Sequence, residues 1–426
     1  MKTLKIAIIA DDLTGANDCG GQLVHYGMDV SVKLDAEFTR RETDGAVIFN
    51  TDSRSLSAAE AKAAVKNISE HISRQSFDIV YKKIDSTMRG NIGAELQSMV
   101  EVFQPDFVLV APGYPQHGRQ VIGGVHYVNG AKLEETEAAN DPKTPVAESN
   151  IQRLIEKQTR KKSGHLSYED IRCGYGHVRN KLERFQAEGI SYVTADSVHE
   201  SDLQDLAFIL RSLPYSIILA GSAGLMSCLP KAFNLKERKP GQTVPSSGLP
   251  IMFVVGSMSR TGRKQLQELF TARLAEKVEM RSERMLFGEG EKRNEFERLK
   301  KRAADVRRRS KHIVLCTSDN AAETQKIGES RGLTPVQTSN AVSGALGEVA
   351  GELIQAFHMN RLFLTGGDTA YQVLRQLGVH EIRLLDEVEP GIPLGSAGED
   401  LYIVTKAGNF GSRSVMASAA IKLQGG

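Results

Sequence analysis

The sequence predicts an α/β fold of two domains, each a mostly parallel sheet flanked by helices. Short apolar runs alternate with amphipathic segments along the chain, a pattern typical of β-α-β units. Residues 231–250 interrupt this alternation, because they are rich in Lys, Pro, Gly and Ser and have no apolar periodicity. We therefore expect one domain at residues 1–230, a linker at 231–250 and a second domain at 251–426.

The composition is that of a globular protein with nearly balanced charge. Of the 426 residues, 40% are hydrophobic and 25% are charged, and the formal net charge is +2. Neither a nucleic acid nor a membrane surface is therefore predicted as a partner. No apolar run is long enough to cross a bilayer, and the N-terminus leads directly into a predicted strand, which favours the cytoplasm. The four cysteines lack the spacing of zinc sites or disulfide frameworks.

Short apolar runs mark the predicted strands. They lie at residues 4–10, 30–33, 45–50, 77–81, 107–110, 192–195 and 216–220 in the first half, and at 251–255, 312–316, 361–364 and 401–406 in the second. Helical patterns follow several of them, as at 19–26, at 57–74 and from 92 onward. Ligands of such sheets bind beyond the carboxyl ends of the strands, so the residues that follow each strand are the candidates for a site.

Two adjacent acids, Asp11 and Asp12, follow the first strand and lead into the turn Thr14-Gly15. Neighbouring carboxylates repel one another and need a cation, a metal ion or a hydroxyl group to face. A helix cap is the simpler explanation, but it accounts for only one of the two acids. We therefore favour a functional role. The third strand ends in a similar polar stretch that contains Arg54.

The stretch at residues 81–91 is the densest in reactive side chains. Asp85 could accept a proton there, while Lys83 and Arg89 could hold an anionic substrate, next to Ser86 and before a helix N-terminus. An ordinary strand-to-helix turn capped by Asp85 or Ser86 explains the same stretch about equally well on local grounds.

The segment at residues 111–127 is rich in Pro and Gly, which predicts a shaped loop rather than a regular element. Arg119 is its best candidate for an anion contact. His117 and His126 are interpreted as ordinary hydrogen-bonding residues.

Glycines follow three strands of the second half, at Gly256-Ser257, Gly366-Gly367 and Gly408. Glycines let backbone N–H groups approach an anion closely, and the N-terminus of a following helix favours one. Each stretch alone is best explained as a tight turn, but three in one domain suit a nucleotide. The basic run at residues 292–311 contains interspersed Glu and Ala, which favours a solvated helix face over a nucleic-acid site.

Taken together, these stretches resemble the four-carbon acid sugar kinase family over nearly the whole chain. The matching pieces are residues 10–16 (ADDLTGA), 85–87 (DST) with 89–91 (RGN), 112–119, 256–257 (GS), 365–369 (TGGDT) and 406–411 (KAGNFG). The resemblance implies an N-terminal acid-sugar-binding domain and a C-terminal ATP-binding domain, with the active site in the interdomain cleft. Residues 82–89 and 127–130 are more similar to the D-threonate kinases than to the 3-oxo-tetronate kinases, and D-erythronate kinases are an alternative.

The resemblance also assigns residues to the two ligands. Asp11, Asp12, Arg54, Lys83, Asp85 and Ser86 would contact the sugar acid, in addition to Arg89 and Arg119 from the chemistry above. Ser257, Gly366, Gly367, Asp368, Thr369, Gly408, Asn409 and Phe410 would contact ATP. The cofactors implied are ATP and Mg²⁺, and an assembly into a homo-oligomer is left open.

Phosphoryl transfer needs a base near the acceptor hydroxyl, and Asp85 and Asp12 are the candidates. We prefer Asp85, because Lys83 and Arg89 would keep it ionised. Asp11 would face Mg²⁺ or cap its helix, and no set of metal ligands is assigned.

Two other classes of protein agree less well with the sequence. A nucleotide-dependent dehydrogenase is disfavoured because no G-x-G-x-x-G follows a first strand. A non-catalytic ligand-binding or regulatory protein would have no use for so many acids at strand ends.

Overall fold

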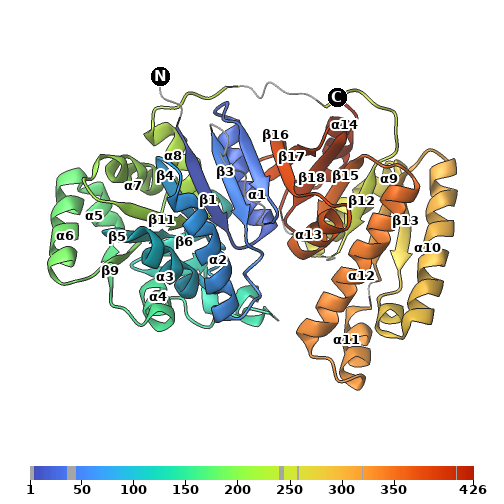
Figure 1. Ribbon diagram of the computed structural model, residues 1–426, viewed down its shortest axis with the longest axis horizontal. Coiled ribbons are helices and arrows are strands. Elements are labelled where there is room, and N and C mark those ends of the chain that lie inside the picture. The colour runs from blue at the N-terminus through green and yellow to red at the C-terminus, as the bar shows by residue number, and fades with distance from the viewer. Residues whose placement is uncertain are drawn as a thin grey trace. The chain divides into compact units, whose positions relative to one another are not determined.

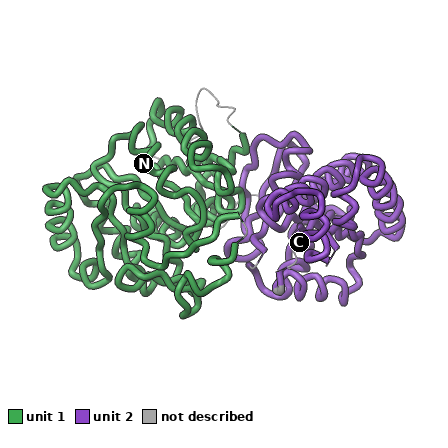
Figure 2. Tube along the Cα trace, turned by 90° about the horizontal axis from the view of Figure 1, so that it is seen from below, with its two compact units in different colours: residues 1–239 green, residues 240–426 purple. Residues whose placement is uncertain are grey.

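The computed structural model describes residues 4–35, 45–141, 143–238, 244–256, 259–318, 320–408 and 410–426. The chain divides into two compact units, residues 1–239 (unit 1) and residues 240–426 (unit 2), which Figure 2 colours separately. Each unit has a hydrophobic core of its own. No helix in the described residues is both long and apolar enough to cross a membrane.

Unit 1 contains a parallel sheet whose strands lie in the order β2-β3-β1-β4-β11-β5-β10-β9 (Figure 1). Every neighbouring pair in this order is parallel. The strands are β1 (Ile6–Ala10), β2 (Val30–Lys33), β3 (Ala46–Asn50), β4 (Ile79–Lys83), β5 (Phe107–Ala111), β9 (Ser163–Leu166), β10 (Tyr192–Ala195) and β11 (Ile217–Gly221). The predicted mostly parallel α/β architecture is confirmed. The ends of the predicted strands differ from the observed ones by a residue or two, and β9 was not predicted.

Helices of unit 1 pack in two groups. One group is α1 (Leu13–Val24), α7 (Glu200–Ser212) and α8 (Ala223–Ala232), and the other is α2 (Ala58–Ser73), α3 (Ile92–Phe103) and α4 (Ile151–Thr159). The helices α5 (Tyr168–Arg172) and α6 (Tyr175–Ala187) connect β9 to β10. A sheet with helices on its faces needs strands that are apolar on both sides, which explains why β1 reads as a continuous apolar run and is buried throughout.

The strand order places the ends of β1, β3 and β4 side by side. Ala10, the last residue of β1, pairs with Asn50 of β3 on one side and with Lys83 of β4 on the other. These three strands therefore end at one level. The next two strands of the chain, β2 and β3, lie on one side of β1, whereas β4 lies on its other side. A reversal of this kind opens the crevice in which α/β sheets bind their ligands.

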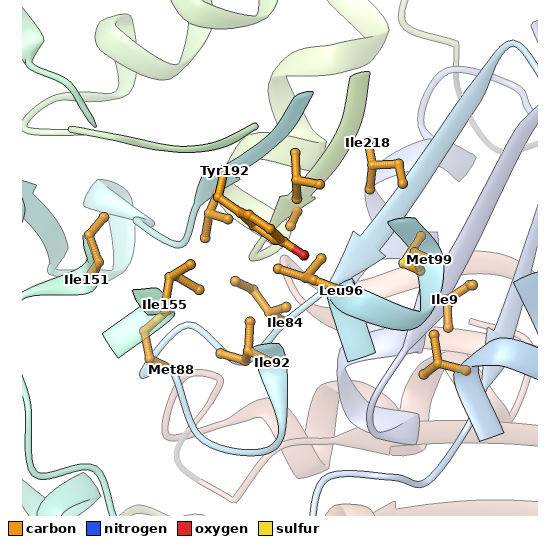
Figure 3. Packing of buried hydrophobic residues seen from close by; sticks show 14 of the residues in the cluster. Ile9, Ile84, Met88, Ile92, Leu96, Met99, Ile151, Ile155, Tyr192 and Ile218 are labelled. Carbon is orange, nitrogen blue, oxygen red and sulfur yellow. The ribbon is translucent and has the colours of Figure 1, made fainter. Parts of the chain in front are cut away.

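A buried hydrophobic cluster anchors the loop after β4 (Figure 3). Ile84 and Met88 lie on either side of Asp85 in the sequence, and both are fully buried in the cluster with Ile92 and Leu96 of α3. Met88 has a φ of 58°, an uncommon conformation for a side chain of this kind. Burial of its side chain holds this strained backbone in place, so the loop has little freedom to move.

The Pro- and Gly-rich segment forms more regular structure than the sequence predicts. Residues 119–132 fold into a small antiparallel sheet of β6 (Arg119–Ile122), β7 (Val125–Val128) and β8 (Ala131–Lys132). The prediction of a loop without elements was wrong here, because a tight Gly123-Gly124 turn between two short strands reads as loop composition. Both glycines have positive φ, and their N–H groups donate to the buried carboxylate of Asp196.

Unit 2 has strands in the order β13-β14-β12-β15-β18-β17-β16. The strands are β12 (Met252–Val255), β13 (Ala275–Met280), β14 (His312–Thr317), β15 (Arg361–Thr365), β16 (Glu381–Glu389), β17 (Ile392–Ala397) and β18 (Leu401–Lys406). Pairs from β13 to β18 are parallel, and β17 is antiparallel to both β18 and β16. The antiparallel strands β16 and β17 were not predicted.

Helices of unit 2 also form two groups. The helices α9 (Arg260–Thr271) and α14 (Val415–Leu423) pack together, and α10 (Glu289–Arg308), α11 (Ala321–Ser330), α12 (Pro335–Ala356) and α13 (Gly367–Gln376) form the other group. Thr365 at the end of β15 pairs with Val255 of β12 and with Lys406 of β18. The ends of these three strands are level, as in unit 1.

Candidate functional site

Arg54 is the centre of the charged cluster in unit 1. Its Nε and Nη2 donate to the two oxygens of Asp11, at 2.7 and 3.0 Å, and its Nη1 lies 2.7 Å from Oδ2 of Asp12. The same Nη1 is 3.8 Å from Oδ1 of Asp85. One guanidinium group thus joins the ends of β1, β3 and β4. Burial opposes ionisation of Asp11, but Arg54, with Lys82 and Lys83, outweighs it and lowers the pKa of that carboxyl.

The two adjacent acids have different roles in the structure. Asp12 is the N-cap of α1, and its Oδ1 accepts a hydrogen bond of 2.9 Å from the N–H of Gly15. The cap is therefore Asp12 and not Asp11, contrary to one of the two roles expected for Asp11. Each oxygen of Asp12 has one partner, Gly15 or Arg54, which leaves each with acceptor capacity.

Asp85 is held more tightly than Asp12. The Nε and Nη2 of Arg89 donate to its two oxygens at 2.7 and 3.1 Å, and both the N–H and the hydroxyl of Thr87 donate to Oδ2. Burial opposes the charge, but Arg89 and Arg54, with these hydrogen bonds, hold the pKa of Asp85 well below its usual range. The third nitrogen of Arg89 donates to Asp141 at 3.0 Å.

Residues 89–91 contact the turn that follows β3 and so hold it next to the loop after β4. Gly90 has a φ of 100°, and a side chain on it would approach Arg54 and Asp11 closely. Asn91 donates from Nδ2 to the carbonyl of Leu56 at 2.8 Å. Gly90 is therefore required both by its conformation and by the approach of Arg54.

Lys83 points toward the N-terminus of α1. A Cβ added to Gly15 would lie 2.5 Å from its Nζ and 2.6 Å from Oδ1 of Asp12, so the ammonium group and the helix cap share this place. Its Nζ donates a hydrogen bond to the carbonyl of Ile84 at 2.9 Å. Lys82 points to the other face of the sheet, as alternation in a strand requires, and forms a fully buried ion pair of 2.8 Å with Glu95.

Arg119 and His126 of the small sheet lie near the loop that carries Asp85 and Ser86. Arg119 begins β6, its Nη1 donates to the carbonyl of His117, and its Nε is buried without a hydrogen-bond partner among the described residues. Burial lowers the pKa of Arg119, and Asp85 acts in the opposite direction. His126 is buried with Nε2 2.7 Å from the carbonyl of Ser86, so it ties β7 to the loop that carries Asp85.

The structure joins five of the residues of unit 1 predicted for substrate or catalysis in one network of ion pairs: Asp11, Asp12, Arg54, Asp85 and Arg89. Lys83 lies by Asp12, Arg119 interacts electrostatically with Asp85, and Ser86 lies in the same loop as Asp85 with its carbonyl bound by His126. Sequence reasoning gave no role to Asp141 or Glu95, and it interpreted His126 as an ordinary hydrogen-bonding residue, which agrees with its bonds to the carbonyls of Ser86 and Gln120. Asp141 lies in an irregular Asn-Asp-Pro stretch, which was the only available signal.

Three glycine-containing strand ends of unit 2 are joined to one another. A Cβ on Gly256 would lie 1.8 Å from Oγ1 of Thr369, so the end of β12 packs directly on α13. The N–H of Gly366 donates to the carbonyl of Lys406 at 3.1 Å, and the hydroxyl of Ser259 donates to the carbonyl of Gly408 at 2.8 Å. The ends of β12, β15 and β18 thus form one surface.

The remaining predicted nucleotide residues lie on this surface or outside the described residues. Gly366 is the N-cap of α13, Gly367 begins the helix, and Asp368 is exposed in its first turn. Phe410 follows Gly408 in the loop after β18. Ser257 and Asn409 lie outside the described residues.

Gly366 is the glycine of this surface whose conformation another residue would not tolerate. Its φ of 96° and ψ of 119° lie in a region that a Cβ disfavours. We expect Gly366→Ala to shift the N-terminus of α13 and to raise the KM for a nucleotide about tenfold, the scale of such backbone strain. Enzyme kinetics at varied nucleotide concentration measure this.

Gly378→Ala is the matched control, since Gly378 has a φ of 67° at the other end of the same helix and open space around it. It should lower the melting temperature in the same way and leave the KM unchanged. Equal rises in KM for both variants would show that backbone strain anywhere in this helix impairs binding, and that the position of Gly366 at the N-terminus of α13 has no special role.

The described residues contain no group of three or more His, Cys, Asp or Glu that could hold a metal ion. What unit 1 offers instead is a set of ionised carboxylates beside guanidinium and ammonium groups, which suits a small anionic molecule with hydroxyl groups. What unit 2 offers is a glycine-lined edge at a helix N-terminus, which suits phosphates. These are the parts of a two-domain phosphotransferase.

Comparisons with known proteins agree. Residues 6–229 match the model of a sugar-binding N-terminal domain, and residues 252–416 that of a nucleotide-binding C-terminal domain. The chain is 34% identical to a D-threonate kinase of Salmonella typhimurium LT2, over 98% of this chain and 97% of that protein. It is 30% identical to a 3-oxo-tetronate kinase of Pseudomonas savastanoi pv. phaseolicola, over 99% and 97% of the two chains.

The chain belongs to the four-carbon acid sugar kinase family. Its fold is also that of a Salmonella typhimurium LT2 protein solved as a putative tRNA synthase, with a TM-score of 0.80 and 25% identity over 97% of this chain and 98% of that one. The family identification therefore rests on the sequence, and this comparison shows a shared fold.

Proposed function

We propose that the protein transfers the γ-phosphate of ATP to the 4-hydroxyl group of a four-carbon sugar acid, with D-threonate as the first choice and 4-phospho-D-threonate as product. The observation that carries the proposal is the charged cluster at the ends of β1, β3 and β4, where Arg54 joins three carboxylates and Asp12 keeps acceptor capacity on both oxygens. Arg119, whose Nε has no partner among the described residues, interacts electrostatically with Asp85 of this cluster. The similarity to a D-threonate kinase supports the choice of acid. D-Erythronate and 3-oxo-tetronate are the alternatives, the latter because of a relative of that name.

Arg119 and Lys83 are the better candidates for binding the acid's carboxylate. Arg54 and Arg89, which the sequence also suggested, already use the N–H groups of their Nε–Nη2 edges on Asp11 and Asp85. We assign these two arginines to holding the carboxylates in place. A carboxylate entering the cluster would meet Arg119, whose Nε has no other partner among the described residues.

Asp12 is the better candidate for the base. A base must accept a proton, and Asp85 has four donated hydrogen bonds and a strongly lowered pKa. Asp12 has one donor on each oxygen and is fixed by its role as the cap of α1. The order of preference drawn from the sequence is therefore reversed, with Asp85 second.

The nucleotide would bind to unit 2, on the surface formed by Gly256, Gly366 and Gly408. Mg²⁺ bound with ATP takes most of its ligands from phosphates and water and needs one or two carboxylates. The exposed carboxylate of Asp368, in the first turn of α13 beside the glycines, fits that need. The ion would neutralise the charge on the transferred phosphate.

An ATP-consumption assay with purified protein and a panel of D-threonate, D-erythronate, L-threonate and 3-oxo-tetronate tests the proposal. We expect the highest kcat/KM with D-threonate, and a phosphate on carbon 4 in the product by ³¹P and ¹³C NMR. A higher kcat/KM with another acid would reassign the substrate. If none of the four acids supports ATP consumption, the proposal is overturned.

A further inference from the structure

The loop that follows β18 is held from one side by three side chains. Lys406 Nζ donates to the carbonyls of Ala407, Gly408 and Phe410, at 2.7, 2.9 and 3.2 Å. Gln265 of α9 places its Nε2 at 3.0, 3.1 and 2.9 Å from the carbonyls of Phe410, Gly411 and Ser412. Ser259, the N-cap of α9, adds a bond to the carbonyl of Gly408. All the described carbonyls from residue 407 to residue 412 are therefore bound.

Peptide geometry fixes what the other side of the loop presents. In a planar trans peptide, the carbonyl of one residue and the N–H of the next point in opposite directions. The carbonyls of residues 407, 410 and 411 are bound by Lys406 and Gln265. The N–H groups of the residues that follow them, Gly408, Gly411 and Ser412, therefore point away from these two side chains. The N–H of Ser412 already meets an anion there, since it donates to the carboxylate of Glu389 at 2.6 Å.

We propose that Lys406 and Gln265 are positioning residues of the nucleotide site, which bind carbonyls of the loop after β18 so that the N–H groups of Gly408 and Gly411 face the phosphates of ATP. The inference rests on the proposed binding of ATP to unit 2. Both side chains are about 1% exposed, so they act through the loop and do not touch the nucleotide themselves. The Oε1 of Gln265 is buried without a partner among the described residues, which indicates that this amide is placed for its donor side.

The charge of Lys406 adds a pH dependence. Burial lowers the pKa of Lys406 to about 8, against the opposite effect of Glu389. Below that pH the ammonium group has three N–H donors for three carbonyls, and above it one donor is replaced by a lone pair that faces an oxygen. Affinity for ATP should therefore be full below pH 8 and should fall as the pH rises through it.

Binding of ATP and of adenosine, measured by calorimetry without the sugar acid, tests the proposal. Lys406→Met and Gln265→Met should each weaken ATP binding about tenfold, the loss expected for buried hydrogen bonds, and leave adenosine binding unchanged. Lys406→Arg should restore affinity for ATP and abolish its decline above pH 8, because arginine does not titrate there. Lys422→Met is the matched control, because it removes a lysine of α14 that is paired with Asp386 of β16.

Equal losses for ATP and adenosine would mean a general structural role and would overturn the inference, as would unchanged ATP binding in both Met variants. Should a Met variant fail to fold, the pH profile of Lys406→Arg decides. A wild-type protein that binds no ATP at all would instead sink the proposed function, so the two failures can be told apart.

Discussion

Asp12→Asn should lower kcat by about 10²-fold or more while the protein stays folded. The acceptor hydroxyl loses its proton as it attacks the phosphorus, and a positioned carboxylate contributes on this scale. Asn cannot accept that proton, but it caps a helix as well as Asp does, so the bond to the N–H of Gly15 is retained. Steady-state kinetics should show a KM for ATP that barely changes.

Two further variants make this result specific. Asp85→Asn should reduce kcat less than Asp12→Asn, because Asp85 is already committed to Arg89 and Thr87. Asp170→Asn is the control, since Asp170 is also ion-paired and also accepts a backbone N–H at the start of a helix, that of Ser167, but belongs to α5. A larger loss in Asp85→Asn would return the base to Asp85, and near-normal kcat in both would show that the acids are structural.

The parts of the site that the sequence predicts are those that follow apolar strands. Asp11, Lys83 and Gly366 each come directly after or at the end of a buried strand, and parallel strands that end level bring such residues together. The architecture follows from the same pattern, since strands buried on both faces cannot alternate polar and apolar residues.

The pairings within the site could not be predicted, because they depend on register and on loops. Arg54 meets Asp11 only because β3 pairs with β1 in the observed register. Asp141 meets Arg89 from 52 residues away through an irregular loop. Such partners leave no periodic signal in the sequence.

The role of Lys406 was hidden for a different reason. A lysine at the end of a strand usually reaches solvent, and nothing in the sequence tells that this one turns back beneath its own loop. The strand β16 was missed because its first half carries exposed charged residues, Glu381 and Arg383, and was interpreted as a surface segment.

Arg119→Met should raise the KM for the sugar acid by roughly 10- to 100-fold, the usual worth of a hydrogen bond to a charged group. The reason is that the buried Nε of Arg119 has no partner among the described residues until a carboxylate arrives. The discriminating measurement compares D-threonate with threitol, which has the hydroxyl groups but no carboxylate. Wild-type protein should prefer the acid strongly, and Arg119→Met should lose most of that preference by raising the KM for the acid alone.

A matched pair of variants separates charge from packing in this experiment. Arg119→Lys keeps a point charge without the planar fork, so its KM for the acid should lie between those of the wild type and Arg119→Met. Arg184→Met removes an exposed arginine of α6 in the same unit and should change neither KM. If Arg119→Met raises the KM for threitol and for D-threonate equally, Arg119 has only a structural role, through its bond to the carbonyl of His117. The carboxylate of the acid must then be bound by Lys83 or by the remaining N–H groups of Arg54 and Arg89.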